Sequence, residues 1–95
     1  MSDQFSRTRL LLGDEAVERL RRAKVIVFGI GGVGGFAAEA LARGGIGRLE
    51  LVDSDVVSLG NLNRQLIALH STIRRAKAEL MAERVRDINP DCELK

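Results

Sequence analysis

A run of β-branched and aromatic residues that leads directly into a cluster of glycines constrains this chain more than any other feature. Residues 25–28 read Val-Ile-Val-Phe without polar alternation, which predicts a strand buried on both faces, as in a parallel sheet. Glycines follow at positions 29, 31, 32 and 34. Apolar residues then recur at helical spacing and predict an amphipathic helix. They are Val33, Phe36, Ala37, Ala40 and Leu41.

The rest of the chain continues this alternation of strands and helices. The predicted elements are a helix over 14–22, a strand over 48–53, an irregular segment over 54–70, a helix over 72–88 and the opening of a third strand from Cys92. We therefore expect an α/β chain with the N-terminal half of a Rossmann-like doubly wound fold, in which a helical arm over 1–22 precedes a nucleotide-binding unit over 23–95. So few strands leave a sheet edge open, so the chain is either a fragment of a longer domain or completed by oligomerisation.

Size and composition narrow the classes of function. The 95 residues allow one domain, and 45% apolar with 29% charged residues is typical of a soluble globular chain. Fifteen basic against 13 acidic residues give a net charge of only +2, which by itself does not indicate a nucleic-acid-binding protein. A single cysteine, Cys92, cannot form an internal disulfide and favours a reducing cytoplasm. The longest apolar stretch, residues 25–42, is interrupted by glycines and Glu39, so we expect no membrane span.

The glycine cluster matches the pattern G-x-G-x-x-G in the strand-to-helix context that the motif requires. Gly29 permits the tight turn, Gly31 and Gly32 let the backbone approach a phosphate-bearing ligand, and Gly34 allows close packing of the helix. An acidic residue about 20 positions further on would take the ribose hydroxyls, and Asp53 stands 24 positions after Gly29. The alternative is that the glycines serve only a tight turn.

A polar segment after the second predicted strand indicates which nucleotide binds. Asp55, Asn61, Asn63, Arg64 and Lys77 follow Asp53 and place amides and cations near the strand ends. A nicotinamide dinucleotide has little use for cations beyond its diphosphate, whereas a triphosphate with magnesium needs compensation of its β and γ charges. The sequence therefore favours ATP with Mg²⁺ over NAD.

These motifs together resemble the ATP-dependent carboxylate-activating superfamily that includes ThiF, MoeB and the ubiquitin-activating enzymes. The resemblance covers nearly the whole chain and adds Phe5-Ser6-Arg7 and Ile88-Asn89-Pro90 to the motifs above. Within the superfamily, residues 4–8, 37–47 and 88–92 look most like the tRNA threonylcarbamoyladenosine dehydratases.

The resemblance implies an adenylation with ligase-type chemistry. ATP binds at the glycine loop, a substrate carboxylate attacks the α-phosphate, and an acyl adenylate and pyrophosphate form. Asp53 then holds the ribose, while Asn61, Arg64 and Lys77 contact the phosphates. Arg7 resembles the arginine that such homodimers supply to the partner's ATP. In the dehydratases a nitrogen of the threonylcarbamoyl group on tRNA displaces AMP and closes a ring, which requires no cysteine nucleophile.

The chain departs from the family pattern at two positions and in length. Arg74 stands where the family usually has a glycine three residues before the lysine, so we expect a different turn there, and Gly35 replaces a small residue, often serine. The family's domain is much longer, and its metal-binding aspartate would lie beyond Lys95, so none of these residues is assigned as a metal ligand.

Several alternatives stay open. The chain could activate a sulfur-carrier or ubiquitin-like protein, be an NAD-dependent oxidoreductase, or be an inactive nucleotide-binding fragment. We interpret His70 as a surface or packing residue and Cys92 as a small buried one. The basic residues 74, 75, 77, 84 and 86 could touch tRNA phosphates, but no aromatic residues lie between them, so we favour a solvated helix face.

Overall fold

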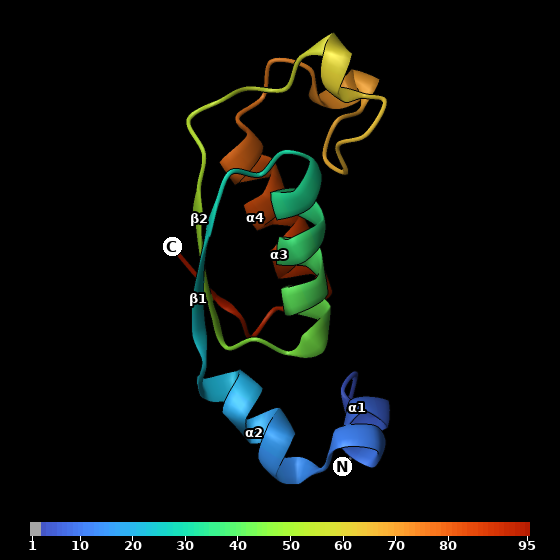
Figure 1. The fold of residues 1–95 in the computed structure, drawn as a ribbon, viewed down its shortest axis with the longest axis vertical. Helices are drawn as coiled ribbons and strands as arrows, with labels where there is room; N and C mark the ends of the chain where they lie inside the picture. Colours follow the sequence, from blue (N-terminus) through green and yellow to red (C-terminus); the bar gives the residue numbers. More distant parts are fainter. Residues whose placement is uncertain (1–2) are drawn as a thin grey trace.

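The structure, a computed structural model, describes residues 3–95 as a short parallel sheet with helices on one side and at one end (Figure 1). Its helices are α1 (Ser6–Leu12), α2 (Asp14–Arg22), α3 (Gly32–Gly44) and α4 (Lys77–Ile88), with 3₁₀ turns at Leu59–Asn61 and His70–Thr72. Its strands are β1 (Lys24–Phe28), β2 (Arg48–Val52) and β3 (Glu93–Leu94). The strands are parallel in the order β1-β2-β3, as expected for the first half of a doubly wound sheet.

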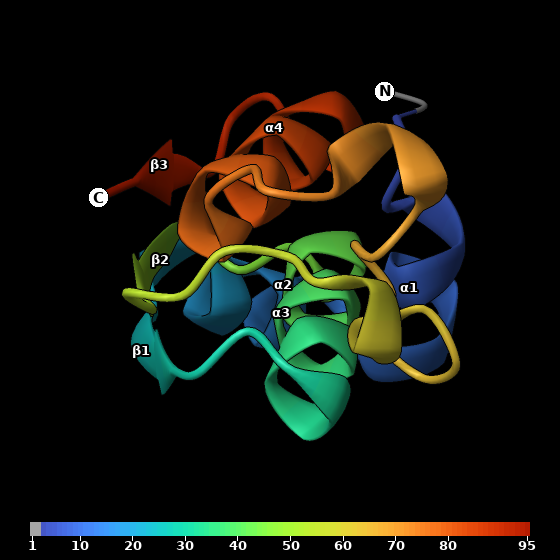
Figure 2. The same ribbon diagram turned by 90° about the horizontal axis from the view of Figure 1, so that it is seen from above.

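Both crossover helices lie on the same face of this sheet. The chain moves in one direction across the sheet, from β1 through α3 to β2 and then through α4 to β3, and right-handed crossovers in one direction place their helices on one side. Figure 2 shows the three strands in one layer, with α3 and α4 beside each other in the other. Helices α1 and α2 lie beyond the amino ends of the strands, and residues 54–76 lie beyond the carboxyl ends (Figure 1).

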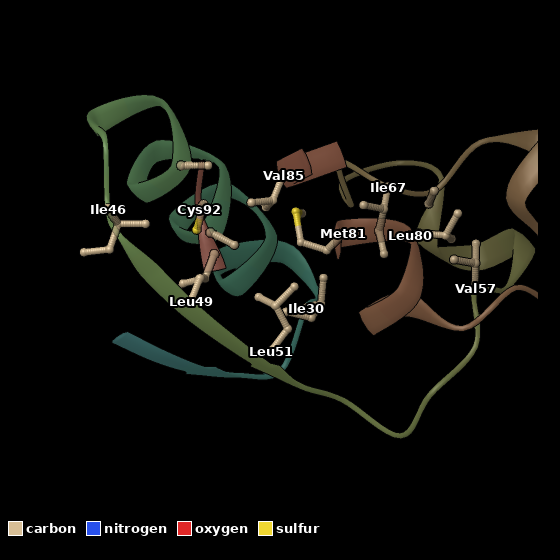
Figure 3. Packing of buried hydrophobic residues seen from close by; sticks show 13 residues of the cluster. Ile30, Ile46, Leu49, Leu51, Val57, Ile67, Leu80, Met81, Val85 and Cys92 are labelled. Atoms are coloured by element: carbon tan, nitrogen blue, oxygen red, sulfur yellow. The ribbon is translucent and has the colours of Figure 1, made fainter. Parts of the chain in front are cut away.

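The hydrophobic core fills the space between the sheet and the two crossover helices (Figure 3). Leu49 and Leu51 of β2 face Met81 and Val85 of α4, and Met81 and Val85 are fully buried. Cys92 is buried in the same cluster, as the sequence predicted. Among the described residues no helix has the length and apolar character needed to cross a bilayer.

The prediction that β1 is buried on both faces is wrong for this chain. Its side chains alternate between half-buried and exposed, and Phe28 is 76% exposed. The reason is the common placement of α3 and α4, which covers one face of the sheet and leaves Ile26 and Phe28 on the other.

The apolar stripe of α3 is also placed differently from the pattern. Val33 and Phe36 are exposed, while the buried positions are Gly35, Ala38 and Ala42. A Cβ on Gly35 would lie 3.3 Å from Ile30 O and 3.7 Å from Met81 Cε of α4, and Asn89 donates to Ala42 O, so this side of α3 packs closely against the loop and α4. Close packing there favours small residues and overrides the preference for burying large apolar ones.

The last long helix begins later than the sequence predicts, at Lys77 rather than at Thr72. The hydroxyl of Thr72 does not cap a helix, because it donates to Ile67 O at 2.7 Å and accepts from the N–H of Leu69 at 2.9 Å. Arg74 then turns the chain with a left-handed φ of 76°, and Ala76 forms an antiparallel bridge with Val56. Arginine therefore occupies a backbone conformation that favours glycine.

Candidate functional site

The glycine loop lies at the carboxyl end of β1, where the backbone turns sharply into α3. Gly29 has a φ of 86°, and its N–H donates to Val52 O at 2.8 Å, which joins the end of β1 to the end of β2. A Cβ atom on Gly34 would lie 1.7 Å from Gly29 O, so no side chain is possible there without moving the loop. The structure confirms the close packing that the motif predicts at this position.

Among residues 3–95, the first backbone N–H groups of α3 have no hydrogen-bond acceptor and can donate to an anion. Gly31 is the N-cap and supplies no side chain, and the first turn carries no acidic residue. The first N–H within the helix to find a backbone acceptor is that of Gly35, which donates to Gly31 O at 3.0 Å. A Cβ on Gly32 would meet nothing within 4 Å, so space is open in front of the turn. Free N–H groups and the helix dipole together favour a phosphate at this end.

Asp53 joins the glycine loop to the end of β2. One carboxylate oxygen accepts from the N–H of Ile30 and the other from the N–H of Asp55, both at 2.7 Å. This gives the loop a fixed position, and each oxygen still has lone-pair capacity for a ligand hydroxyl. The contact with a ribose stays a prediction.

Lys77 is brought to the same edge by a backbone hydrogen bond. Its N–H donates to Asp55 O at 3.0 Å, so α4 begins directly beside the end of β2. The side chain is only 6% exposed, and within residues 3–95 its ammonium forms no hydrogen bond or ion pair. A cation in the first turn of a helix is also unfavourable to the helix dipole. A mostly buried lysine whose ammonium is unpaired within residues 3–95 but not fully buried is suited to binding an anion in this position.

The amides and the arginine of the predicted phosphate segment lie on the first 3₁₀ turn and directly after it. Asn61 Oδ1 accepts from the N–H of Ser58 at 3.0 Å and so caps that turn. Arg64 donates to Asn63 Oδ1 at 2.8 Å and to Gly60 O at 3.1 Å. These acceptors are neutral, and no carboxylate in the described part of the chain pairs with Arg64, so its positive charge stays available.

Arg7 is not brought to this site. It is exposed on α1, beyond the amino ends of the strands, whereas the glycine loop lies at their carboxyl ends (Figure 1). The predicted contribution of Arg7 to a partner's nucleotide therefore stays a prediction.

Other candidates have ordinary structural roles. Arg75 pairs with Glu79 and Glu83, as expected for a solvated face, whereas Arg84 of α4 pairs with the mostly buried Glu39 of α3. The prediction of a solvated face is wrong for Lys77, which is 6% exposed. His70 is exposed. Burial raises the pKa of the Cys92 thiol, which makes it a poor nucleophile near neutral pH.

Gln65, which follows Arg64 in the segment, has no role that the sequence alone predicts. Gln65 is 92% buried, since 8% of it is exposed, and its amide lies against Gly31. Its position directly after Arg64 was visible in the sequence, but its burial follows from the fold of residues 59–72 over the glycine loop.

A comparison with known families and proteins gives consistent results. The model of the ThiF family matches residues 5–95. The chain is 55% identical over 94 residues to the tRNA threonylcarbamoyladenosine dehydratase of Bacillus subtilis (strain 168), covering 99% of this chain and 37% of that protein. It is 38% identical over 94 residues to the sulfur carrier protein ThiS adenylyltransferase of Escherichia coli (strain K12), covering 96% of this chain and 37% of that protein.

The structure of the chain also superposes on solved structures of related enzymes. The crystal structure of the E. coli tRNA N6-threonylcarbamoyladenosine dehydratase in complex with ATP superposes with a TM-score of 0.94 at 50% identity, and the match covers 97% of this chain and 38% of that one. The chain thus spans a little over a third of the length of these relatives.

Proposed function

The chain belongs to the ThiF family, and from this membership we propose that it forms the nucleotide-binding part of an enzyme that activates a carboxylate with ATP. The observation that carries the proposal is the meeting of unpaired donors and cations at one edge of the sheet. The free N–H groups of α3, Lys77 and Arg64 all lack an anionic partner within residues 3–95. A polyphosphate supplies the missing negative charge.

The proposed reaction is an adenylation. A substrate carboxylate oxygen bonds to the α-phosphorus of ATP, the bond from this phosphorus to the bridging oxygen breaks, and the electron pair leaves with pyrophosphate. The acyl adenylate then carries AMP as its leaving group. Lys77 and Arg64 stabilise the negative charge that grows on the phosphate oxygens, and Asp53 holds the ribose so that the α-phosphorus stays beside α3.

We infer that the substrate is the threonylcarbamoyl group of a modified adenosine in tRNA. A nitrogen of that group attacks the activated carbonyl, AMP leaves, and a ring closes with net loss of water. The proposal is supported by the 55% identity to a dehydratase, against 38% to an adenylyltransferase that acts on a sulfur carrier. Activation of a sulfur-carrier or ubiquitin-like protein is the second candidate, and it shares the first step.

The accompanying groups are proposals too. We infer that Mg²⁺ enters with ATP as its counterion. Residues 3–95 contain no cluster of three acidic, histidine or cysteine side chains that could hold a metal by themselves, so no step is assigned to it. A homodimer, in which Arg7 reaches the partner's nucleotide, and a cytoplasmic location complete the proposal.

Calorimetric titration with ATP and Mg²⁺ tests nucleotide binding, with NAD titrated in parallel. We expect saturable binding of ATP that weakens about 10- to 100-fold in Arg64→Ala and in Lys77→Met, since each variant loses a charge-assisted hydrogen bond. Arg22→Ala is the matched control, because this substitution removes the same charge from an exposed residue of α2, at the other end of the molecule.

The outcomes separate the alternatives. Binding of NAD without ATP would replace the proposal by the oxidoreductase alternative. Equal weakening by Arg22→Ala would mean that net charge, not the site, governs affinity. If ATP binds as expected, release of pyrophosphate on addition of threonylcarbamoyladenosine-containing tRNA, and not on addition of a sulfur-carrier protein, supports the dehydratase proposal.

A further inference from the structure

A buried carboxamide lies directly against the glycine loop. Gln65 is 8% exposed, and its Nε2 atom is 3.4 Å from the point where a Cβ on Gly31 would lie. Its backbone is fixed on both sides, because its N–H donates to Asn61 O at 2.9 Å and its carbonyl accepts from the N–H of Ala68 at 3.1 Å. The side chain is therefore held beside the N-cap of α3 by the fold of the segment that covers the loop.

The two ends of this amide are in different surroundings. Oε1 is fully buried and has no hydrogen-bond partner among residues 3–95. Nε2 has no partner in this part of the chain either, but it is not among the fully buried unpartnered atoms, so it keeps access to solvent beside the loop. An unpaired buried carbonyl lowers stability, and most buried polar groups in proteins avoid this state. In this structure the cost of the unpaired Oε1 accompanies an Nε2 donor group that is held beside the loop.

We propose that Gln65 is a phosphate-binding residue, and that its Nε2 donates a hydrogen bond to a phosphate oxygen of the nucleotide held at the start of α3. The inference rests on the proposed nucleotide binding and adds a residue to it. The polarity of the amide fits an anion, because the backbone N–H groups at the start of α3, beside which it lies, are donors as well. The reversed amide would present a carbonyl oxygen to the phosphate and repel it.

A purely structural role predicts a different result. If the amide only filled space against Gly31, then replacing it by an apolar side chain of similar length and flexibility would preserve the contact and leave nucleotide affinity unchanged. Gln65→Met is such a replacement. It also removes the unpaired carbonyl, so the free protein should be at least as stable as the wild type.

The test combines thermal unfolding of the free chain with titrations of ATP and adenosine. For Gln65→Met we expect an unchanged or raised Tm, ATP binding weakened about tenfold, and unchanged adenosine binding, because adenosine carries no phosphate. Gln4→Met is the matched control, since Gln4 Nε2 donates to Ile88 O on the exposed surface at the other end of the molecule. It should leave both affinities unchanged.

Each other outcome overturns the inference. Equal ATP affinity in wild type and Gln65→Met would show that the amide does not contact phosphate. A lowered Tm, with ATP and adenosine weakened to the same extent, would show a structural role. If the wild-type chain itself fails to bind ATP, both the proposed function and the inference fail. If wild type and variant bind ATP equally well, only the inference about Gln65 fails.

Discussion

Gly34→Ala should be among the most damaging single-atom changes in this chain. The added Cβ would lie 1.7 Å from Gly29 O, and real Cβ contacts essentially never come closer than 3.0 Å, so α3 and the loop must separate by about 1.3 Å. Overpacking of this kind costs about 1–3 kcal/mol, and disturbing the 2.8 Å bond from Gly29 N–H to Val52 O adds about 1 kcal/mol. Against a total stability of about 5–14 kcal/mol for a chain of this size, the loss is large.

Urea unfolding of Gly34→Ala measures this loss, and Gly32→Ala is the control with the same added atom. A Cβ on Gly32 meets nothing within 4 Å, so the control should be as stable as the wild type, or more stable by about 0.5–1 kcal/mol because alanine suits a helix better. Its ATP affinity should fall instead, because the methyl group enters the space that a phosphate would occupy. Wild-type stability in Gly34→Ala would refute the reasoning, and so would equal destabilisation by both variants.

Three further changes test the framework around the site. Arg74→Gly should stabilise the chain by about 1 kcal/mol in thermal unfolding, because glycine adopts the φ of 76° without strain; an unchanged or lowered Tm would contradict this. The hydrogen bond from Arg84 holds the pKa of Glu39 below its usual 4.5, so the stability that this pair contributes is present above that value and is lost as the pH falls towards the lowered pKa. Urea unfolding at neutral and acidic pH should therefore show that Glu39→Gln loses less unfolding free energy on acidification than the wild type does. The difference should be at most about 1 kcal/mol, because the pair is partly exposed, and an equal loss in both proteins would refute the prediction. Asn89→Leu should lower the free energy of unfolding, measured with urea, by about 1–3 kcal/mol, because the buried amide donates to Ala42 O and Ile46 O at 3.3 Å. An unchanged free energy of unfolding would show that these two bonds do not stabilise the fold.

The strand, glycine loop and helix at the centre of the site could be predicted because their signals are local. The unbroken apolar run of β1, the left-handed turn at Gly29 and the helical spacing after it are properties of neighbouring residues. Asp53 at the end of β2 was found by its distance from the loop, and the structure places it in contact with Ile30. Local patterns were therefore sufficient to predict the type of each of these elements and the edge of the sheet at which the site lies.

The buried faces and the start of α4 could not be predicted because they depend on tertiary contacts. Because α3 packs closely against α4, Ala38 and Ala42 are buried and Phe36 is left exposed, contrary to the hydrophobic pattern. The start of α4 is set by Asp55, whose carbonyl accepts from Lys77, and by the bridge of Ala76 to Val56. Neither partner is adjacent in sequence, so helical periodicity alone extended the helix five residues too far towards the N-terminus.

The start of α4 at Lys77 places this lysine where a binding role explains its position better than a structural one. In a helix from Thr72 this lysine would lie within the second turn, where a solvated cation needs no special explanation. In the structure it is the first residue of the helix, 6% exposed, at the dipole end that disfavours positive charge, and follows Arg74 and Arg75 closely. Of these three cations only Arg75 pairs with acidic side chains in the described chain. Arg74 and Lys77 therefore bring positive charge that is unpaired within residues 3–95 to the carboxyl edge of the sheet, where the free N–H groups of α3 also lie. A bound polyphosphate could pair with both kinds of donor.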